Sequence, residues 1–124
     1  CASMHLLSFL PRDPIGALKL PLLIVQNPTS NGSEVLHQSD KECEQVQVMM
    51  NDHHPQCSPT LLRHEEATLT NVECAIQSLA TSSSQGFGLH FSCHGKYDPG
   101  QRWNSCLKLA DNDVLSVKDI LKLQ

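Results

Sequence analysis

The chain has 124 residues and a formal net charge of −4, with 40% hydrophobic, 18% charged and 4% aromatic residues. This length suits one domain with its own core, built mainly from Leu, Val, Ile and Met because aromatic residues are few. The nine basic residues form no block of three, which argues against nucleic-acid binding, and the longest apolar run, 20–25, is far shorter than the roughly 20 residues that cross a membrane.

In chain order, the first half of the sequence predicts a short helix, a strand and a longer helix. Apolar residues between Met4 and Leu10 favour a short helix, which the prolines that follow would stop. The continuous apolar run 20–25 is followed by a turn-rich segment and predicts a strand buried on both faces. Residues 39–50 have helical spacing, and Ser39 with Glu42 forms a capping-box pattern.

The second half continues to alternate between strands and helices. A short strand is expected around 61–62, then a helix over 69–79 with a second capping box at Thr70 and Glu73. Another buried strand is predicted over 87–93, then a strand over 106–109 and a helix over 116–123 that Ser116 and Asp119 would cap. This order predicts an α/β fold with a mainly parallel sheet flanked by helices.

His94 is the most informative candidate for chemistry. It follows the predicted strand 87–93, and ligands of open parallel sheets gather at the carboxyl ends of the strands. Gly95 comes next, and a glycine lets the backbone approach a ligand closely. His90 lies about 13 Å earlier along the same strand, too far to share a metal with His94, so we expect it to be structural.

The cysteine beside His94 is not expected to act with it. Adjacent strand residues point to opposite faces, so Cys93 should lie in the core, and Cys106 is also read as a core residue of its strand. The six cysteines are widely spaced and no secretory signal is visible, which favours reduced thiols in a cytoplasmic protein.

Two further clusters are interpreted as surface features. His53, His54 and Cys57 could bind a soft metal, but the chain has no Cys-x-x-Cys pair, so a solvated loop is favoured. Glu65 and Glu66 are adjacent and should diverge, unlike a glycosidase's paired carboxylates. There is also no glycine-rich phosphate-binding loop, and the sequence predicts neither a metal nor a cofactor.

Several segments together resemble a known family. Residues 89–95, LHFSCHG, resemble the His-Gly signature of the CHAT domain, the caspase-like domain associated with tetratricopeptide repeats. Residues 105–111, SCLKLAD, are similar to its next strand, and residues 115–120, LSVKDI, to its next helix. With segment 23–28, Glu42 and 67–68 in the same order, the resemblance covers roughly residues 20–123, and fungal members look most similar.

The resemblance implies a caspase-like three-layer fold and a cysteine endopeptidase acting on a peptide or protein substrate. In it, His94 would act as general base and acid, and the N–H of Gly95 would help to form the oxyanion hole. Residues 1–19 would be an N-terminal segment and residues 20–124 the N-terminal part of a CHAT domain. The family's nucleophilic cysteine lies on a later strand, so the fold is expected to be incomplete at its C-terminus, with a bare hydrophobic edge on the His94 strand.

Two functions remain open at this point. The chain is either part of a peptidase whose cysteine lies beyond residue 124, or a non-catalytic scaffold module of a tetratricopeptide-repeat signalling protein. Those repeats, in the same or a partner chain, are the expected partners, with no nucleic acid and no membrane. A hydrolase built on Cys93 or Cys57 is the least supported alternative, and the isolated chain is expected to have no peptidase activity.

Overall fold

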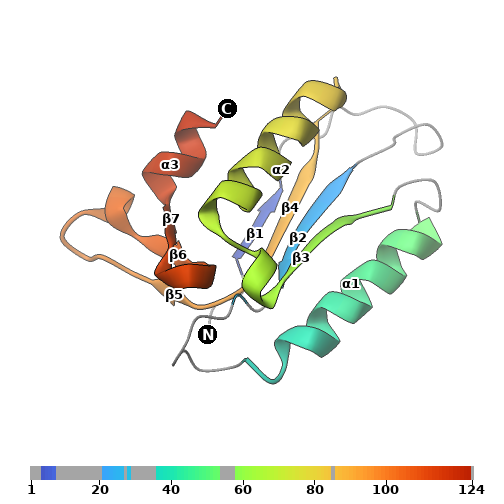
Figure 1. Ribbon diagram of the computed structural model, residues 1–124, viewed down its shortest axis with the longest axis horizontal. Coiled ribbons are helices and arrows are strands. Elements are labelled where there is room, and N and C mark those ends of the chain that lie inside the picture. Colours follow the sequence, from blue (N-terminus) through green and yellow to red (C-terminus); the bar gives the residue numbers. More distant parts are fainter. Residues whose placement is uncertain are drawn as a thin grey trace.

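A four-stranded sheet forms the centre of the protein (Figure 1). The computed structural model describes residues 4–7 (backbone only), 21–26, 28, 36–53, 58–84 and 86–123. The strand order is β1-β4-β2-β3, made from β1 (Met4–Leu7), β2 (Leu22–Gln26), β3 (Thr60–Arg63) and β4 (Gly88–Ser92). Strands β2, β3 and β4 run parallel and β1 runs antiparallel to β4, so the predicted α/β fold with a mainly parallel sheet is confirmed.

Helices cover both faces of this sheet. Consecutive residues of β2 point to opposite faces, so one strand contributes to two clusters. Leu22 and Ile24 pack with Cys43 of α1 (Ser39–His53), whereas Leu23 and Val25 pack with α2 (Leu69–Ser82). Within the strand predicted over 20–25, residues 22–25 are therefore buried on both faces, as the continuous apolar run indicated.

A second, smaller sheet packs beside the α2 face. It consists of the antiparallel strands β5 (Gly95–Lys96), β6 (Cys106–Lys108) and β7 (Val114–Ser116), and α3 (Val117–Lys122) follows it. Leu107 and Leu115 of this sheet belong to the same buried cluster as Leu23 and Val25, so both sheets share one core. In the described part of the chain, three short 3-10 turns connect the elements: η1 (His64–Glu66), η2 (Arg102–Asn104) and η3 (Ala110–Asn112).

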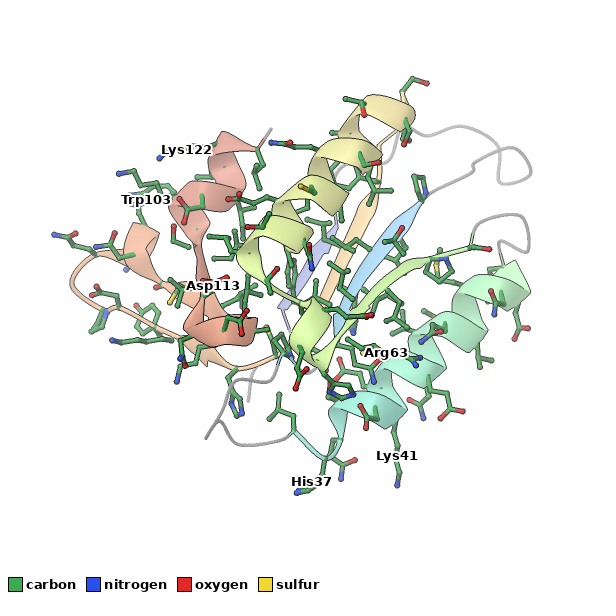
Figure 2. All side chains as sticks on the ribbon, in the orientation of Figure 1. His37, Lys41, Arg63, Trp103, Asp113 and Lys122 are labelled. Carbon is green, nitrogen blue, oxygen red and sulfur yellow. The ribbon has the colours of Figure 1, made fainter. Side chains whose placement is uncertain are left out.

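The first two long helices begin at the predicted residues, Ser39 and Leu69, but the capping residues predicted for them are wrong. The hydroxyl of Ser39 donates to the carbonyl oxygen of Ser92 instead of capping α1. Helix α2 is capped by Thr68, whose Oγ1 accepts from the N–H of Asn71 at 3.3 Å. Asp113 adds a second acceptor for this helix, since its Oδ2 lies 3.0 Å from the N–H of Leu69 (Figure 2). A tertiary partner thus takes the hydroxyl of Ser39, whereas α2 keeps a local cap two residues before the predicted one.

The N-terminal prediction is also wrong for the described residues 4–7. They form strand β1 rather than a helix, with Met4 opposite Phe91 and Leu7 opposite Gly88. Because a free strand edge presents unpaired N–H and C=O groups, an extended segment can satisfy them by pairing. The edge of β4 that we expected to be bare is therefore covered. Residues 8–20, the rest of the predicted helix among them, lie outside the described residues.

The capping box of α3 is confirmed and should make stability depend on pH. Ser116 Oγ accepts from the N–H of Asp119 at 3.1 Å, and Asp119 Oδ2 accepts from the hydroxyl and the N–H of Ser116 at 2.6 and 3.2 Å. These bonds, the hydroxyl's first, lower the pKa of the Asp119 carboxyl. Because the pKa is lowered in the folded state, the ionised carboxylate stabilises the fold at pH values above the ordinary pKa of the carboxyl. This contribution is lost as the pH falls through the folded-state pKa.

We therefore expect Asp119→Asn to lower the free energy of unfolding at neutral pH by roughly 0.5–1 kcal/mol. The difference from wild type should shrink as the solution is acidified through the carboxyl range, because both chains then carry an uncharged side chain. Urea unfolding followed by circular dichroism at a series of pH values measures it. A difference that stays constant with pH would assign the effect to packing rather than to charge.

Candidate functional site

His94 lies where the chain passes from the large sheet to the small one. Strand β4 ends at Ser92, and half-buried His94 precedes β5. The carbonyl oxygen of His94 accepts from the N–H of Lys108 at 2.8 Å, which ties this turn to β6. The parallel strands β2 and β4 end together, with Gln26 opposite Ser92, so His94 follows the carboxyl edge of the sheet as the sequence predicted.

Gly95 presents its backbone N–H away from the small sheet. It pairs with Leu107, and the bond from Lys108 to His94 makes this a non-hydrogen-bonded pair of the antiparallel ladder. The N–H of Gly95 is therefore directed away from β6. A Cβ at this position would lie 3.6 Å from the carbonyl oxygen of Cys106, an ordinary contact, so sterics alone do not require glycine here.

Together these two residues offer a base and a hydrogen-bond donor on one turn. An imidazole can accept and return a proton, and a backbone N–H that is not used by a ladder can bind an oxygen that becomes negative. Acyl transfer also requires a nucleophile close to this base and this donor.

Cys93 does not supply that nucleophile. Its side chain belongs to the core cluster beside α2 and is 3% exposed, as predicted. Burial raises the pKa of its thiol to about 12, which leaves almost no thiolate at neutral pH. Cys43 of α1 is also fully buried, against β2, and burial is the main cause that raises its thiol pKa.

The remaining cysteines are placed differently. Cys106 lies in β6 and is half-buried, so it is less enclosed than the core position that we expected. Cys74 is exposed on α2, and Cys57 lies outside the described residues.

Thiol labelling tests this assignment. In the native protein near neutral pH, iodoacetamide should modify Cys74 rapidly and Cys93 hardly at all, because Cys93 is both buried and protonated. Digestion and mass spectrometry of time points measure the two rates, and labelling in urea provides the unfolded reference. Native labelling of Cys93 as fast as that of Cys74 would show that its thiol is accessible and would reopen it as a nucleophile.

The two other candidate clusters show no binding geometry in their described residues. His53 is exposed at the end of α1, and residues 54–57 lie outside the described part. Within the described ranges, no three His, Cys, Asp or Glu side chains are grouped to hold a metal ion. Glu65 and Glu66 are both exposed in η1, and Glu66 accepts from the N–H of nearby Arg63 at 3.5 Å.

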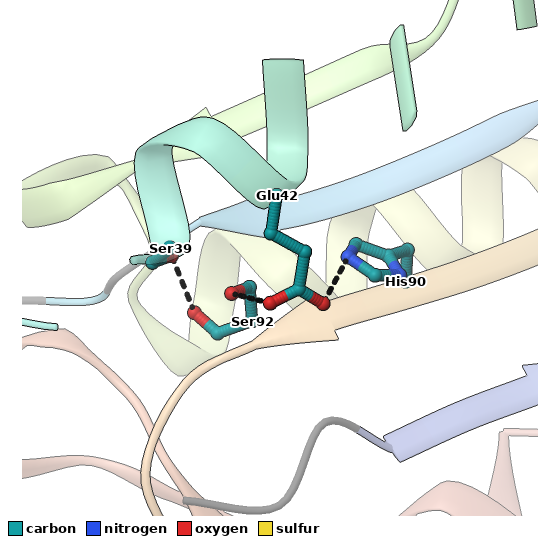
Figure 3. A network of polar contacts seen from close by, with 4 residues as sticks. All are labelled: Ser39, Glu42, His90 and Ser92. Atoms are coloured by element: carbon teal, nitrogen blue, oxygen red, sulfur yellow. Dashed lines mark hydrogen bonds and ion pairs between the residues drawn. The ribbon is translucent and has the colours of Figure 1, made fainter. Parts of the chain in front are cut away.

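A polar network missed at the sequence level lies directly before His94 (Figure 3). Glu42 Oε1 is 3.3 Å from Nε2 of His90, and Glu42 Oε2 accepts from the hydroxyl of Ser92 at 3.2 Å. The hydroxyl of Ser39 donates to the carbonyl oxygen of Ser92 at 3.2 Å. His90 is buried against a helix, in keeping with the structural role we expected. One feature of the sequence could have predicted this network. His90 and Ser92 alternate with Phe91 on a buried strand, so both lie on one face and need polar partners there.

A further contact joins the same helix turn to β2. The side-chain amide of Gln26, at the end of β2, donates to Oδ1 of Asp40 at 2.6 Å. The first turn of α1 therefore contacts the last residues of both central strands.

The geometry can be compared with known proteins. No family model, curated protein or solved structure matches this chain. The likeness to the CHAT domain thus rests on the motifs quoted above. Among the described helices, none is long and apolar enough to cross a membrane.

Proposed function

We propose that this chain is part of a caspase-like cysteine endopeptidase domain of the CHAT type. The observation that carries the proposal is the pairing of His94, at the carboxyl edge of the sheet, with the N–H of Gly95, which the strand register directs away from β6. His94 acts as general base and acid, and Gly95 is an oxyanion-hole donor. The nucleophilic cysteine lies outside residues 1–124, and the substrate is a peptide or protein.

The chemistry follows from these roles. The imidazole takes the thiol proton, and the thiolate attacks the scissile carbonyl carbon to form a C–S bond. The oxygen becomes negative and is held by the N–H of Gly95. The C–N bond then breaks as the imidazolium protonates the leaving amine, and water hydrolyses the thioester. None of these steps needs a cofactor.

The proposal also includes a cellular setting. Cys43, Cys74, Cys93 and Cys106 are free thiols, as expected in a reducing compartment, and we place the protein in the cytoplasm. Tetratricopeptide repeats in the same or a partner chain are proposed on the family resemblance.

One observation favours a second candidate, a non-catalytic scaffold module. In the CHAT arrangement, the strand bearing the nucleophile would pair with β4. Here β1 pairs with β4 at the edge that β2 leaves free. A peptidase therefore requires β1 to leave this edge, whereas a scaffold module can keep it.

The test uses the natural polypeptide that contains this chain, read from its gene past residue 124. If it carries the nucleophile, His94→Ala should slow peptide cleavage about 10²–10⁴-fold, the usual contribution of general acid–base catalysis. His37→Ala is the matched control, because His37 is exposed and precedes α1. Cleavage that survives His94→Ala, or a polypeptide without a cysteine on a later strand, would reject the peptidase and favour the scaffold. The 124-residue chain alone should cleave nothing.

A further inference from the structure

Side chains of the first turn of α1 contact the end of β4. They bind both the main chain and the side chains of that strand. Ser39 donates to the carbonyl oxygen of Ser92, and Glu42 accepts from the Ser92 hydroxyl while it contacts His90. Figure 3 shows Glu42 between the two β4 side chains, reaching down from the helix. Glu42 thus links two alternate residues of one strand to a helix on the same face.

Packing of the core does not explain why polar side chains occupy this face of β4. His90 lies opposite Ile24 in the sheet register and is 3% exposed, on the face where Leu22, Ile24 and Cys43 form an apolar cluster. An apolar residue could be buried there without a partner, whereas buried polar groups cost free energy unless they are paired. The Glu42 side chain is 33% exposed, so the cost of burial falls on His90 and Ser92, and buried polar groups are sometimes retained to define one geometry.

The geometry that this network defines is the exit of the chain from the sheet. Ser92 is the last residue of β4, and His94 follows two residues later. On the other side of the turn, the carbonyl oxygen of His94 is held by the N–H of Lys108. The three residues from Ser92 to His94 therefore run between an anchor on α1 and an anchor on β6.

We propose that Glu42 is a positioning residue for His94. Its carboxylate fixes the end of β4 by bridging His90 and Ser92, and so determines where the His94 turn leaves the sheet. The catalytic meaning of this placement rests on the proposed function of His94, but the placement itself can be tested without any reaction.

The experiment is NMR of the 124-residue chain with ¹⁵N-labelled histidine and backbone, and His94→Gln assigns the ring of His94. Glu42→Ala should shift the His94 ring signals and the amides of Cys93 and Gly95. Glu42→Gln should restore much of the wild-type pattern for residues 93–95, because its side-chain oxygen can still accept from Ser92. Glu44→Ala is the matched control, since Glu44 is exposed on the same helix and should leave these signals unchanged.

Wild-type signals for His94, Cys93 and Gly95 in Glu42→Ala, with shifts confined to α1, would overturn the proposal. If Glu42→Ala does not fold, Ser92→Ala replaces it, because this variant removes only the hydroxyl that Glu42 binds; unchanged signals at residues 93–95 would again overturn the proposal. The outcome is separate from that of the cleavage test. A shifted His94 ring in a protein that never cleaves peptides would support positioning by Glu42 and reject the peptidase.

Discussion

Phe91→Ala should lower the free energy of unfolding by about 3–5 kcal/mol. Phe91 is 1% exposed near the end of β4, where it lies opposite Val25 and packs in the cluster shared with α2. Truncation leaves a cavity that the sheet and the helix cannot fill without moving. Because small domains are stable by only about 5–15 kcal/mol, the variant should lose much of its stability.

Urea unfolding followed by far-UV circular dichroism measures this loss. Fluorescence is less suitable, because the chain's one tryptophan, Trp103, is 63% exposed. Leu121→Ala is the control, since Leu121 is 48% exposed and should change stability little. A loss below about 1 kcal/mol for Phe91→Ala would contradict the central place of β4 in the core.

Leu115→Ala should cost about 2–5 kcal/mol and should weaken both sheets at once. Leu115 belongs to β7 of the small sheet, but it is fully buried in the cluster that contains Leu23 of β2 and Val72 of α2. If the two sheets share one core, loss of this side chain should speed amide hydrogen exchange in β2 as well as in β6.

Val114→Ala provides the matched control for this experiment. Val114 precedes Leu115 on the same strand, points to the other face and is 47% exposed. Its truncation should change exchange little. Exchange that is faster in β6 but unchanged in β2 would mean that the small sheet unfolds on its own, against a common core.

The elements that the sequence predicted well are those whose signal is local and long. Strand β2 follows a continuous apolar run, β4 is a short buried segment that comes after a turn-rich loop, and α2 carries Val72, Ile76 and Leu79 on one buried stripe. Strand β5 has two residues and β7 has three, too short for an alternating pattern to be read. Strand β1 was missed because pairing with β4, rather than any propensity of residues 4–7, gives it its structure.

The candidate site, too, could be predicted only in part from the sequence. His94 could be placed from sequence because it follows a clear strand, and strand ends are where ligands bind in such sheets. The network behind it could not, because Glu42 and Ser92 are 50 residues apart, and Ser39 and Ser92 are 53 apart. The predicted capping role of Ser39 was local and plausible, but the end of β4 offered this hydroxyl a buried carbonyl oxygen instead.

The most direct test of His94 as the proton-transfer half of a cysteine peptidase site is covalent trapping. The natural polypeptide that contains this chain is treated with a peptide acyloxymethyl ketone, and the modified residue is located by mass spectrometry. The account predicts labelling of one cysteine outside residues 1–124, slowed about 10²-fold or more by His94→Ala and unaffected by His37→Ala. Labelling that falls on Cys93 or Cys106, or that proceeds equally well without His94, would contradict it.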